Sequence, residues 1–295
     1  MDQKEIKSFL VSFADKYLEG NIDQLSSFNL YKLRDDKEFG CTKRRFDPDD
    51  SMLMRNLYVL LFEDTWTELN MKTLDDGLYR GETLNTYNTM FGRPNDESLH
   101  PGLDRFNPPK ELVEKVDNFQ KSICATIGNM MVLPNKRIKV WDDRGKYQTD
   151  PITKKRYWKS DWQQLYQTIN EYRGCHGLWR DFFDLFLVEL HKALIGEGCK
   201  DKYLPAFLTE NDFGFSKFKG EEGWNNFIKD NLLEDYTDNN LKPLSVSKGY
   251  CYWSTYHMTR ELYLEESERY VDFATMVIRN RSKRMIELIK KKLDL

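Results

Sequence analysis

The chain has 295 residues, and its 45 lysines and arginines against 48 aspartates and glutamates give a formal net charge of −3. A balance this even excludes a surface that coats nucleic acid over its whole area, while it allows a local basic patch. Apolar residues make up 40% of the chain and aromatic residues 14%, which is typical of a globular fold and excludes a disordered chain.

The sequence predicts neither a targeting segment nor a membrane segment. Asp2, Glu5 and Asp15 interrupt the apolar residues near the start, unlike a secretory signal. No later stretch reaches the ~18 consecutive apolar residues that a spanning helix requires. The five cysteines are scattered and never spaced Cys-x-x-Cys, which fits neither a disulfide framework nor a zinc knuckle. We therefore expect a cytoplasmic protein that does not contact a membrane.

Two amphipathic helices are predicted near the start of the chain. Between residues 6 and 17, apolar residues recur at helical spacing, and Gly20 follows directly. In the second helix, Ser51 is the predicted N-cap after Pro48. The predicted buried face of this helix consists of Leu53, Leu57, Leu60, Leu61 and Trp66.

Residues 77–94, GLYRGETLNTYNTMFGRP, carry polar side chains where a helix would show an apolar stripe. In a structural interpretation, Gly81 ends a strand or turn and Glu82 or Thr83 starts a short helix. In a functional interpretation, Arg80 offers a planar fork to a phosphate or carboxylate. Polar side chains at a helix N-terminus then converge on the same ligand, and these are Glu82, Thr83, Asn85 and Thr86.

The middle of the chain predicts a loop and a small β element. Residues 93–109 contain four prolines, which is typical of a long surface loop. In the stretch 125–141, ATIGNMMVLPNKRIKVW, residues 130–133 and 137–141 are predicted strands that flank a turn, with Gly128 and Asn129 as the strand-entry turn.

Beyond Ser160 the pattern is helical, with segments predicted at 162–172, 178–194, 221–230 and 261–293. Arg281 interrupts a near seven-residue rhythm in the last segment, which favours a packed terminal helix over a coiled coil. The predicted fold is mainly α with a small β element (α+β), as one compact domain over residues 1–295. This domain subdivides into a helical N-terminal region over residues 1–94, a loop and β element over residues 95–160, and a helical C-terminal region over residues 161–295.

Familiar catalytic and metal-binding motifs are missing. The sequence contains no HExxH, GxGxxG, Walker A or Gly-x-Ser-x-Gly pattern, so we predict no metal ligand, and the cofactor stays open. The stretch IGNMMVLPNKRI resembles one half of an HNH-type nuclease site. Such a site also needs a histidine base on the preceding strand and a metal ligand on a following helix, and the sequence offers neither. A degenerate HNH-like nuclease is the remote alternative.

Four stretches together resemble a family of uncharacterised bacterial and phage proteins: RGETLNTYNTMFG, ATIGNMMVLPN, KSDWQQLYQTINEY and EEGWNNFIKDNLLEDY. The likeness extends from Tyr79 to Tyr236. The sequence departs from the family pattern at Glu82, where aspartate is usual, and at Ala125, where histidine is usual. The resemblance implies a bacterial or phage setting and a polar site, and it implies no reaction.

We expect an enzyme that acts on a phosphate-bearing substrate, either a nucleotide or a nucleic acid. Glu82 is the predicted general base, and the predicted ligand-binding residues are Arg80, Thr83, Asn85, Thr86 and Asn129. A binding or sensor protein would use the same pocket without turnover. A protein–protein interaction module would use the C-terminal helices, whose basic run over 279–292 also suits a nucleic-acid contact.

Overall fold

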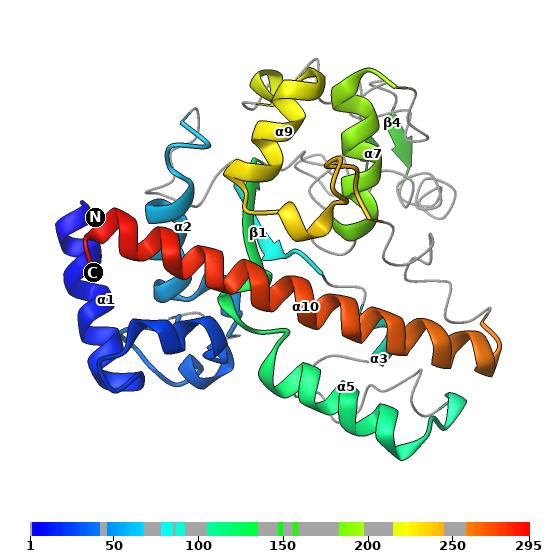
Figure 1. The fold of residues 1–295 in the computed structure, drawn as a ribbon, viewed down its shortest axis with the longest axis horizontal. Helices are drawn as coiled ribbons and strands as arrows, with labels where there is room; N and C mark the ends of the chain where they lie inside the picture. Colours follow the sequence, from blue (N-terminus) through cyan, green and yellow to red (C-terminus); the bar gives the residue numbers. More distant parts are fainter. Residues whose placement is uncertain are drawn as a thin grey trace.

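The computed structural model describes residues 2–41, 46–67, 78–84, 87–91, 105–134, 147–149, 156–158, 183–197, 215–244 and 258–295. The fold is mainly helical with a small antiparallel β element in a single unit, which confirms the predicted class (Figure 1). Its α-helices are α1 (Gln3–Tyr17), α2 (Met52–Phe62), α3 (Tyr87–Phe91), α5 (Lys110–Ser122), α7 (Phe183–Ile195), α9 (Gly220–Asp230) and α10 (Arg260–Leu293).

Short 3₁₀ helices and strands connect these helices. The 3₁₀ helices are η1 (Ile22–Ser27), η2 (Leu30–Leu33), η3 (Pro48–Asp50), η4 (Ile127–Asn129), η7 (Ser216–Phe218) and η8 (Glu234–Tyr236). The strands are β1 (Leu78–Glu82), β2 (Met130–Pro134), β3 (Tyr147–Thr149) and β4 (Arg156–Trp158).

The first two predicted helices are confirmed, together with the residues that start them. Asp2 and Glu5 form a reciprocal capping box at the start of α1, with N···O distances of 2.7 and 2.8 Å. Ser51 caps α2 by accepting a hydrogen bond from the Met54 amide at 3.2 Å. Trp66 and the four predicted apolar residues of α2 are all buried. Local signals alone therefore located both helices.

Helix α10 forms the backbone of the arrangement. It crosses the molecule in Figure 1 and packs against α1, α2, α5, η1 and η4. Thr259 caps its start by accepting a hydrogen bond from the Leu262 amide, and Asp294 ends it in the left-handed region. Lys7 of α1 donates to the carbonyl of Leu293 at 2.6 Å, which joins the two ends of the chain. Among the described helices, none is long and apolar enough to cross a bilayer.

The small sheet pairs two segments that are distant in the sequence. β1 lies antiparallel to β2, with Gly81 opposite Met131 and Glu82 opposite Met130. The strand predicted at 130–133 is thus confirmed, and its described partner is β1. The hairpin partner predicted at 137–141 lies outside the described residues, as do the predicted helix 162–172 and most of the loop 93–109. β3 pairs with β4 in a second antiparallel pair.

Gly128 permits a close contact between η4 and α10. A β-carbon at this position would lie 2.1 Å from the carbonyl oxygen of Ile278 and 2.4 Å from Oγ of Ser282. The Gly128 amide also donates to Ser282 Oγ at 3.0 Å. Because helix backbone lies on the contact side, the neighbours cannot move aside cheaply. Gly128 and Asn129 belong to η4, directly before β2, which confirms the predicted strand-entry turn. The close packing against α10 requires glycine at position 128.

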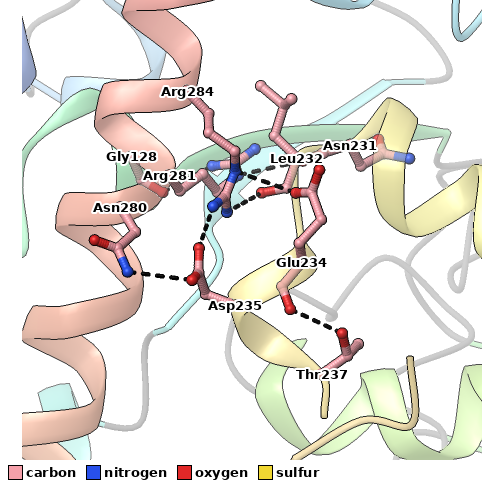
Figure 2. Close-up of polar contacts among 9 residues, drawn as sticks. All are labelled: Gly128, Asn231, Leu232, Glu234, Asp235, Thr237, Asn280, Arg281 and Arg284. Carbon is pink, nitrogen blue, oxygen red and sulfur yellow. Dashed lines mark hydrogen bonds and ion pairs between the residues drawn. The ribbon is translucent and has the colours of Figure 1, made fainter. Parts of the chain in front are cut away.

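Arg281 lies at the centre of the fold with its side chain 1% exposed. Its Nη1 donates to the carbonyl oxygen of Gly128 at 2.8 Å, and its Nε donates to that of Asn231 at 3.2 Å (Figure 2). Nη1 also donates to the carbonyl oxygen of Met130 at 2.6 Å. Burial lowers the pKa of Arg281, but a guanidinium stays protonated in proteins. The residue that interrupts the apolar rhythm of α10 is thus a buried cation that joins η4, β2 and the end of α9.

A partly exposed ion-pair layer surrounds this cation. Arg284 lies one turn further along α10 and pairs with Glu234 at 3.1 Å and with Asp235. Nδ2 of Asn280 donates to Asp235 at 3.1 Å (Figure 2). Both carboxylates belong to η8, so the ion pairs of Arg284 join α10 to η8. Buried Arg281 joins α10 to the turn before η8 through the carbonyl oxygen of Asn231.

Replacing Gly128 with alanine is expected to lower the free energy of unfolding by about 3 kcal/mol, because the added methyl group overlaps the α10 backbone. Urea unfolding measures the loss. Gly196→Ala is the matched control: its φ is +82° and no atom lies within 4 Å of an added β-carbon. It should cost only the backbone strain, about 1 kcal/mol. Equal losses for the two variants would contradict the close contact.

Arg281→Met is expected to lower the free energy of unfolding by about 3 kcal/mol or more. The methionine keeps much of the volume but leaves buried carbonyls without donors. Arg279→Met, an exposed change two residues away on α10, should stay within about 0.5 kcal/mol of the parent. Urea unfolding of the two variants compares them. A small loss for Arg281→Met would show that its hydrogen bonds do not hold the three segments.

Candidate functional site

The predicted site residues fall on the edge where β1 meets η4. Glu82 is the last residue of β1, and Thr83 follows it. The Thr83 amide donates to the carbonyl oxygen of Asn129 at 2.6 Å, so the structure brings Glu82, Thr83 and Asn129 together. The backbone of Arg80 pairs with that of Val132. The side chain of Arg80 lies outside the described portion of the chain, as do Asn85 and Thr86.

Asn129 is fully buried and joins three segments through its side-chain amide. Nδ2 donates to the carbonyl oxygens of Leu84 and Cys124 at 3.2 and 2.8 Å. Oδ1 accepts from the Leu84 amide at 2.9 Å and from Oγ1 of Thr83 at 2.8 Å. These bonds use the full capacity of an asparagine amide. They give Asn129 a structural task, and its role in ligand binding stays a prediction.

Tyr236 extends this network to η8. Its hydroxyl lies 2.6 Å from Oγ1 of Thr83. Because Thr83 gives its single proton to Asn129, the Tyr236 hydroxyl is the donor of this bond. Burial raises the pKa of Tyr236 to about 12, which keeps the proton that the bond requires. The residue next to Glu82 is thus fixed from both sides.

Glu82 belongs to a group of carboxylates that we name the acidic cluster: Asp47, Asp49, Asp50 and Glu82. The 3₁₀ helix η3, which contains Asp49, packs against β1, and Asp49 interacts electrostatically with Glu82. Burial raises the pKa of Asp49 well above its usual value, and the neighbouring charges of Asp47, Glu82 and Asp50 raise it further. Asp50 pairs with Arg55 at 3.0 Å. Asp47 is exposed and Glu82 is partly exposed, so the cluster reaches the surface.

The other ionisable groups near Glu82 are a thiol and phenols whose pKa values are raised. The Tyr87 hydroxyl donates to Oε1 of Glu82 at 3.2 Å. Burial raises the pKa of Cys124 and of Tyr31, and the charge of Glu82 adds to both effects. Burial also raises the pKa of Tyr87. Cys124 is therefore an unreactive thiol, and ionisable chemistry at this edge belongs to the carboxyl groups.

In the acidic cluster, the environment of Asp49 raises its pKa. Asp49 favours its protonated form, and partly exposed Glu82 lies within its electrostatic reach. A carboxyl group with a raised pKa beside other carboxyl groups is a common feature of functional sites. Across the residues that the structure describes, no group of His, Cys, Asp and Glu side chains is arranged to hold a metal ion.

Sequence reasoning identifies one of the four carboxylates of the cluster and misses the other three. Its polar surroundings single out Glu82. Asp47, Asp49 and Asp50 stand in the segment DPDD before Ser51, which by its pattern is only a polar connection. Three carboxylates around a proline at a helix entry were the available signal. Only the contact between η3 and β1 shows that these carboxylates lie near Glu82.

No protein-family model, curated protein or solved structure matches this chain. The resemblance to bacterial and phage proteins therefore stays a prediction. The packing of Gly128 and the hydrogen bonds of Asn129 explain the IGN stretch without a nuclease site.

Asp49→Asn is expected to stabilise the protein at pH 8 and to lose this advantage toward pH 4. The raised folded pKa of Asp49 means that its contribution falls as pH rises from the ordinary carboxyl value, about 4, through the folded value. Asparagine imitates the protonated side chain at every pH. Thermal unfolding between pH 4 and 8 measures the difference from the parent.

The control for this experiment is Asp35→Asn, an exposed aspartate outside the acidic cluster. Its effect on the unfolding midpoint should vary little over the same pH range. If Asp49→Asn destabilised the protein equally at pH 4 and pH 8, Asp49 would not hold a proton in the folded state.

Proposed function

We propose that this protein is an enzyme that acts on a phosphate-bearing substrate, a nucleotide or a nucleic acid, at the acidic cluster. Glu82 is the general base, and Asp49 holds the proton that its environment retains. The observation that carries the proposal is the placement of partly exposed Glu82 near Asp49, whose raised pKa favours the protonated form. The cytoplasmic, bacterial or phage setting belongs to the same proposal.

A rigid support for Glu82 favours catalysis over an accidental cluster of charge. The next residue, Thr83, is fixed by Asn129 and by Tyr236. Tyr87 contacts the carboxylate itself. Catalytic groups require this kind of support, because a displacement of about 1 Å costs much of the rate. A carboxylate on a merely solvated edge needs no such support.

Phosphate recognition requires positive charge at this edge, because carboxylates repel a phosphate. Arg80 stands two residues before Glu82 on β1, and an arginine fork suits phosphate oxygens. In the proposal, Arg80 binds the phosphate, together with Asn85 or Thr86. Thr83 and Asn129 are buried and hydrogen-bonded within the chain, so they support the site without contacting the phosphate. A divalent cation from solution is the alternative source of charge, so every assay is run with and without Mg²⁺.

Glu82→Gln is expected to abolish turnover while leaving the unfolding midpoint nearly unchanged, because glutamine keeps the shape and cannot accept the proton. Arg80→Ala should weaken substrate binding by about 10-fold or more, since a charge-assisted hydrogen bond contributes about 1.5–3 kcal/mol. The measurements are phosphate release and hydrolysis of nucleoside triphosphates, cyclic nucleotides and short single-stranded RNA and DNA. Thermal shift with the same compounds measures binding.

Glu222→Gln provides the matched control, because Glu222 is an exposed glutamate at the start of α9, away from the cluster. It should retain full activity. Ligand-induced stabilisation without turnover in the parent would support the sensor alternative. If no compound stabilises or is converted, with or without Mg²⁺, the proposed function is wrong.

A further inference from the structure

The outer face of α10 carries acidic side chains on its first half. From Glu261 onward, its exposed residues recur at intervals of three and four, so they form one continuous stripe along the helix, which we name the α10 stripe. Arg260, also exposed, precedes the stripe and donates to the carbonyl oxygens of Phe106 and Asn107. The first half of the stripe consists of Glu261, Glu265, Glu268 and Asp272. Lys115 of α5 lies 3.5 Å from Glu268 and 2.7 Å from Asp272. Lys115 supplies one positive charge to the four carboxylates of this half, which stays net negative.

The second half of the stripe is basic, and an apolar residue separates the halves. Met276 is 48% exposed and is the most exposed large apolar side chain among the residues that the structure describes. Beyond it lie Arg279, Lys283 and Lys291, with Glu287 as an exception. The stripe thus changes sign at Met276.

Basic residues beside the stripe are occupied by contacts within the chain. Arg281 is buried, and Arg284 pairs with η8. Lys290 pairs with Asp23 at 3.0 Å, and Lys292 pairs with Asp64 at 2.7 Å. These contacts remove much of the predicted basic surface over 279–292, which weakens the case for nucleic acid on α10. Among the described residues, the unused positive charge of this run is the basic half of the stripe.

The helix macrodipole does not explain this separation of charge. Its effect on side chains falls off within the first and last turns. Glu261 and Lys291, the two ends of the stripe, are 30 positions apart, or about 45 Å at 1.5 Å per residue. Glu268, Asp272, Arg279 and Lys283 lie in the middle turns, where the dipole gives no preference for either sign. A binding partner with the opposite order of charges would favour acidic residues in the first half of the helix and basic residues in the second.

We propose that the α10 stripe binds the α10 stripe of a second copy of this chain, antiparallel, with the two Met276 side chains at the twofold axis. Such an axis brings residues at equal distances before and after Met276 into contact. Glu261 then faces Lys291, Glu268 faces Lys283 within one residue, and Asp272 faces Arg279 within one residue. Each contact occurs twice.

The contacts that this geometry creates determine the affinity of the dimer. Glu265 faces Glu287, which subtracts from the attraction. Exposed ion pairs each contribute about 0.2–1 kcal/mol, and the apolar contact at the axis is small. The dimer is therefore weak, reversible and sensitive to salt, in the class of small polar interfaces.

The test is sedimentation equilibrium of the full chain over a series of concentrations, at about 0.1 M and about 1 M salt, between which the screening length falls from about 10 Å to about 3 Å. The parent should dimerise at low salt and dissociate at high salt. The acidic variant, Lys283→Glu with Lys291→Glu, should weaken the dimer by about 10-fold or more. The basic variant, Glu261→Lys with Glu268→Lys, should do the same.

Mixing the two variants should restore a dimer, because each reversed charge then faces its opposite in the other chain. Lys4→Glu with Lys37→Glu changes the net charge as the acidic variant does, at exposed positions outside the α10 stripe, and should dimerise like the parent. Circular dichroism and thermal unfolding establish that each variant is folded.

A parent that stays monomeric at low salt up to its solubility limit would overturn the proposal. So would association that the acidic variant retains, because another face would then be responsible. If both variants are folded but their mixture does not dimerise, the antiparallel dimer is wrong, and the α10 stripe does not bind a second copy of itself.

Discussion

The buried guanidinium of Arg281 is the interaction on which the rest of the fold depends. A cation taken out of water must receive hydrogen-bond acceptors from other groups, and here backbone carbonyls supply them. Those carbonyls belong to Gly128, Met130 and Asn231, which lie far from α10 in the sequence. Satisfying one side chain therefore fixes η4, the start of β2 and the turn after α9 against the same helix. The missing β-carbon of Gly128 lets this contact become close enough.

The candidate site depends on that constraint. β2 positions β1, and Asn129, next to Gly128, forms hydrogen bonds that hold the chain just after Glu82. Tyr236 reaches the same threonine from η8, which α10 holds through Arg284. Glu82 is thus supported by segments from three regions of the sequence. A site supported in this way is preorganised, because the energy for its geometry comes from folding and not from binding.

The two uses of charge in this protein differ in kind. At the candidate site, charge is placed at a cost to stability: the acidic cluster keeps carboxylates near one another, and burial with these neighbours raises the pKa of Asp49. Groups that destabilise a fold are common at functional sites. On the outer face of α10, charges are separated by sign along the helix, with Met276 at the boundary. In the proposed dimer, this separation places opposite charges face to face.

The sequence by itself determined α1, α2, α7, α9 and α10, because periodicity and capping residues such as Ser51 act within a few neighbouring residues. It also marked Glu82 and Asn129 as unusual, since polar residues in glycine-containing stretches break the apolar pattern. It did not predict α5. Only the tertiary structure decided that β1 pairs with β2, that Asp49 lies near Glu82 and that Arg281 is buried. These are contacts between distant segments, and no local pattern specifies which segments meet. Arg281 shows the reason most clearly: in the sequence it interrupts an apolar rhythm, and in the fold distant carbonyls surround it.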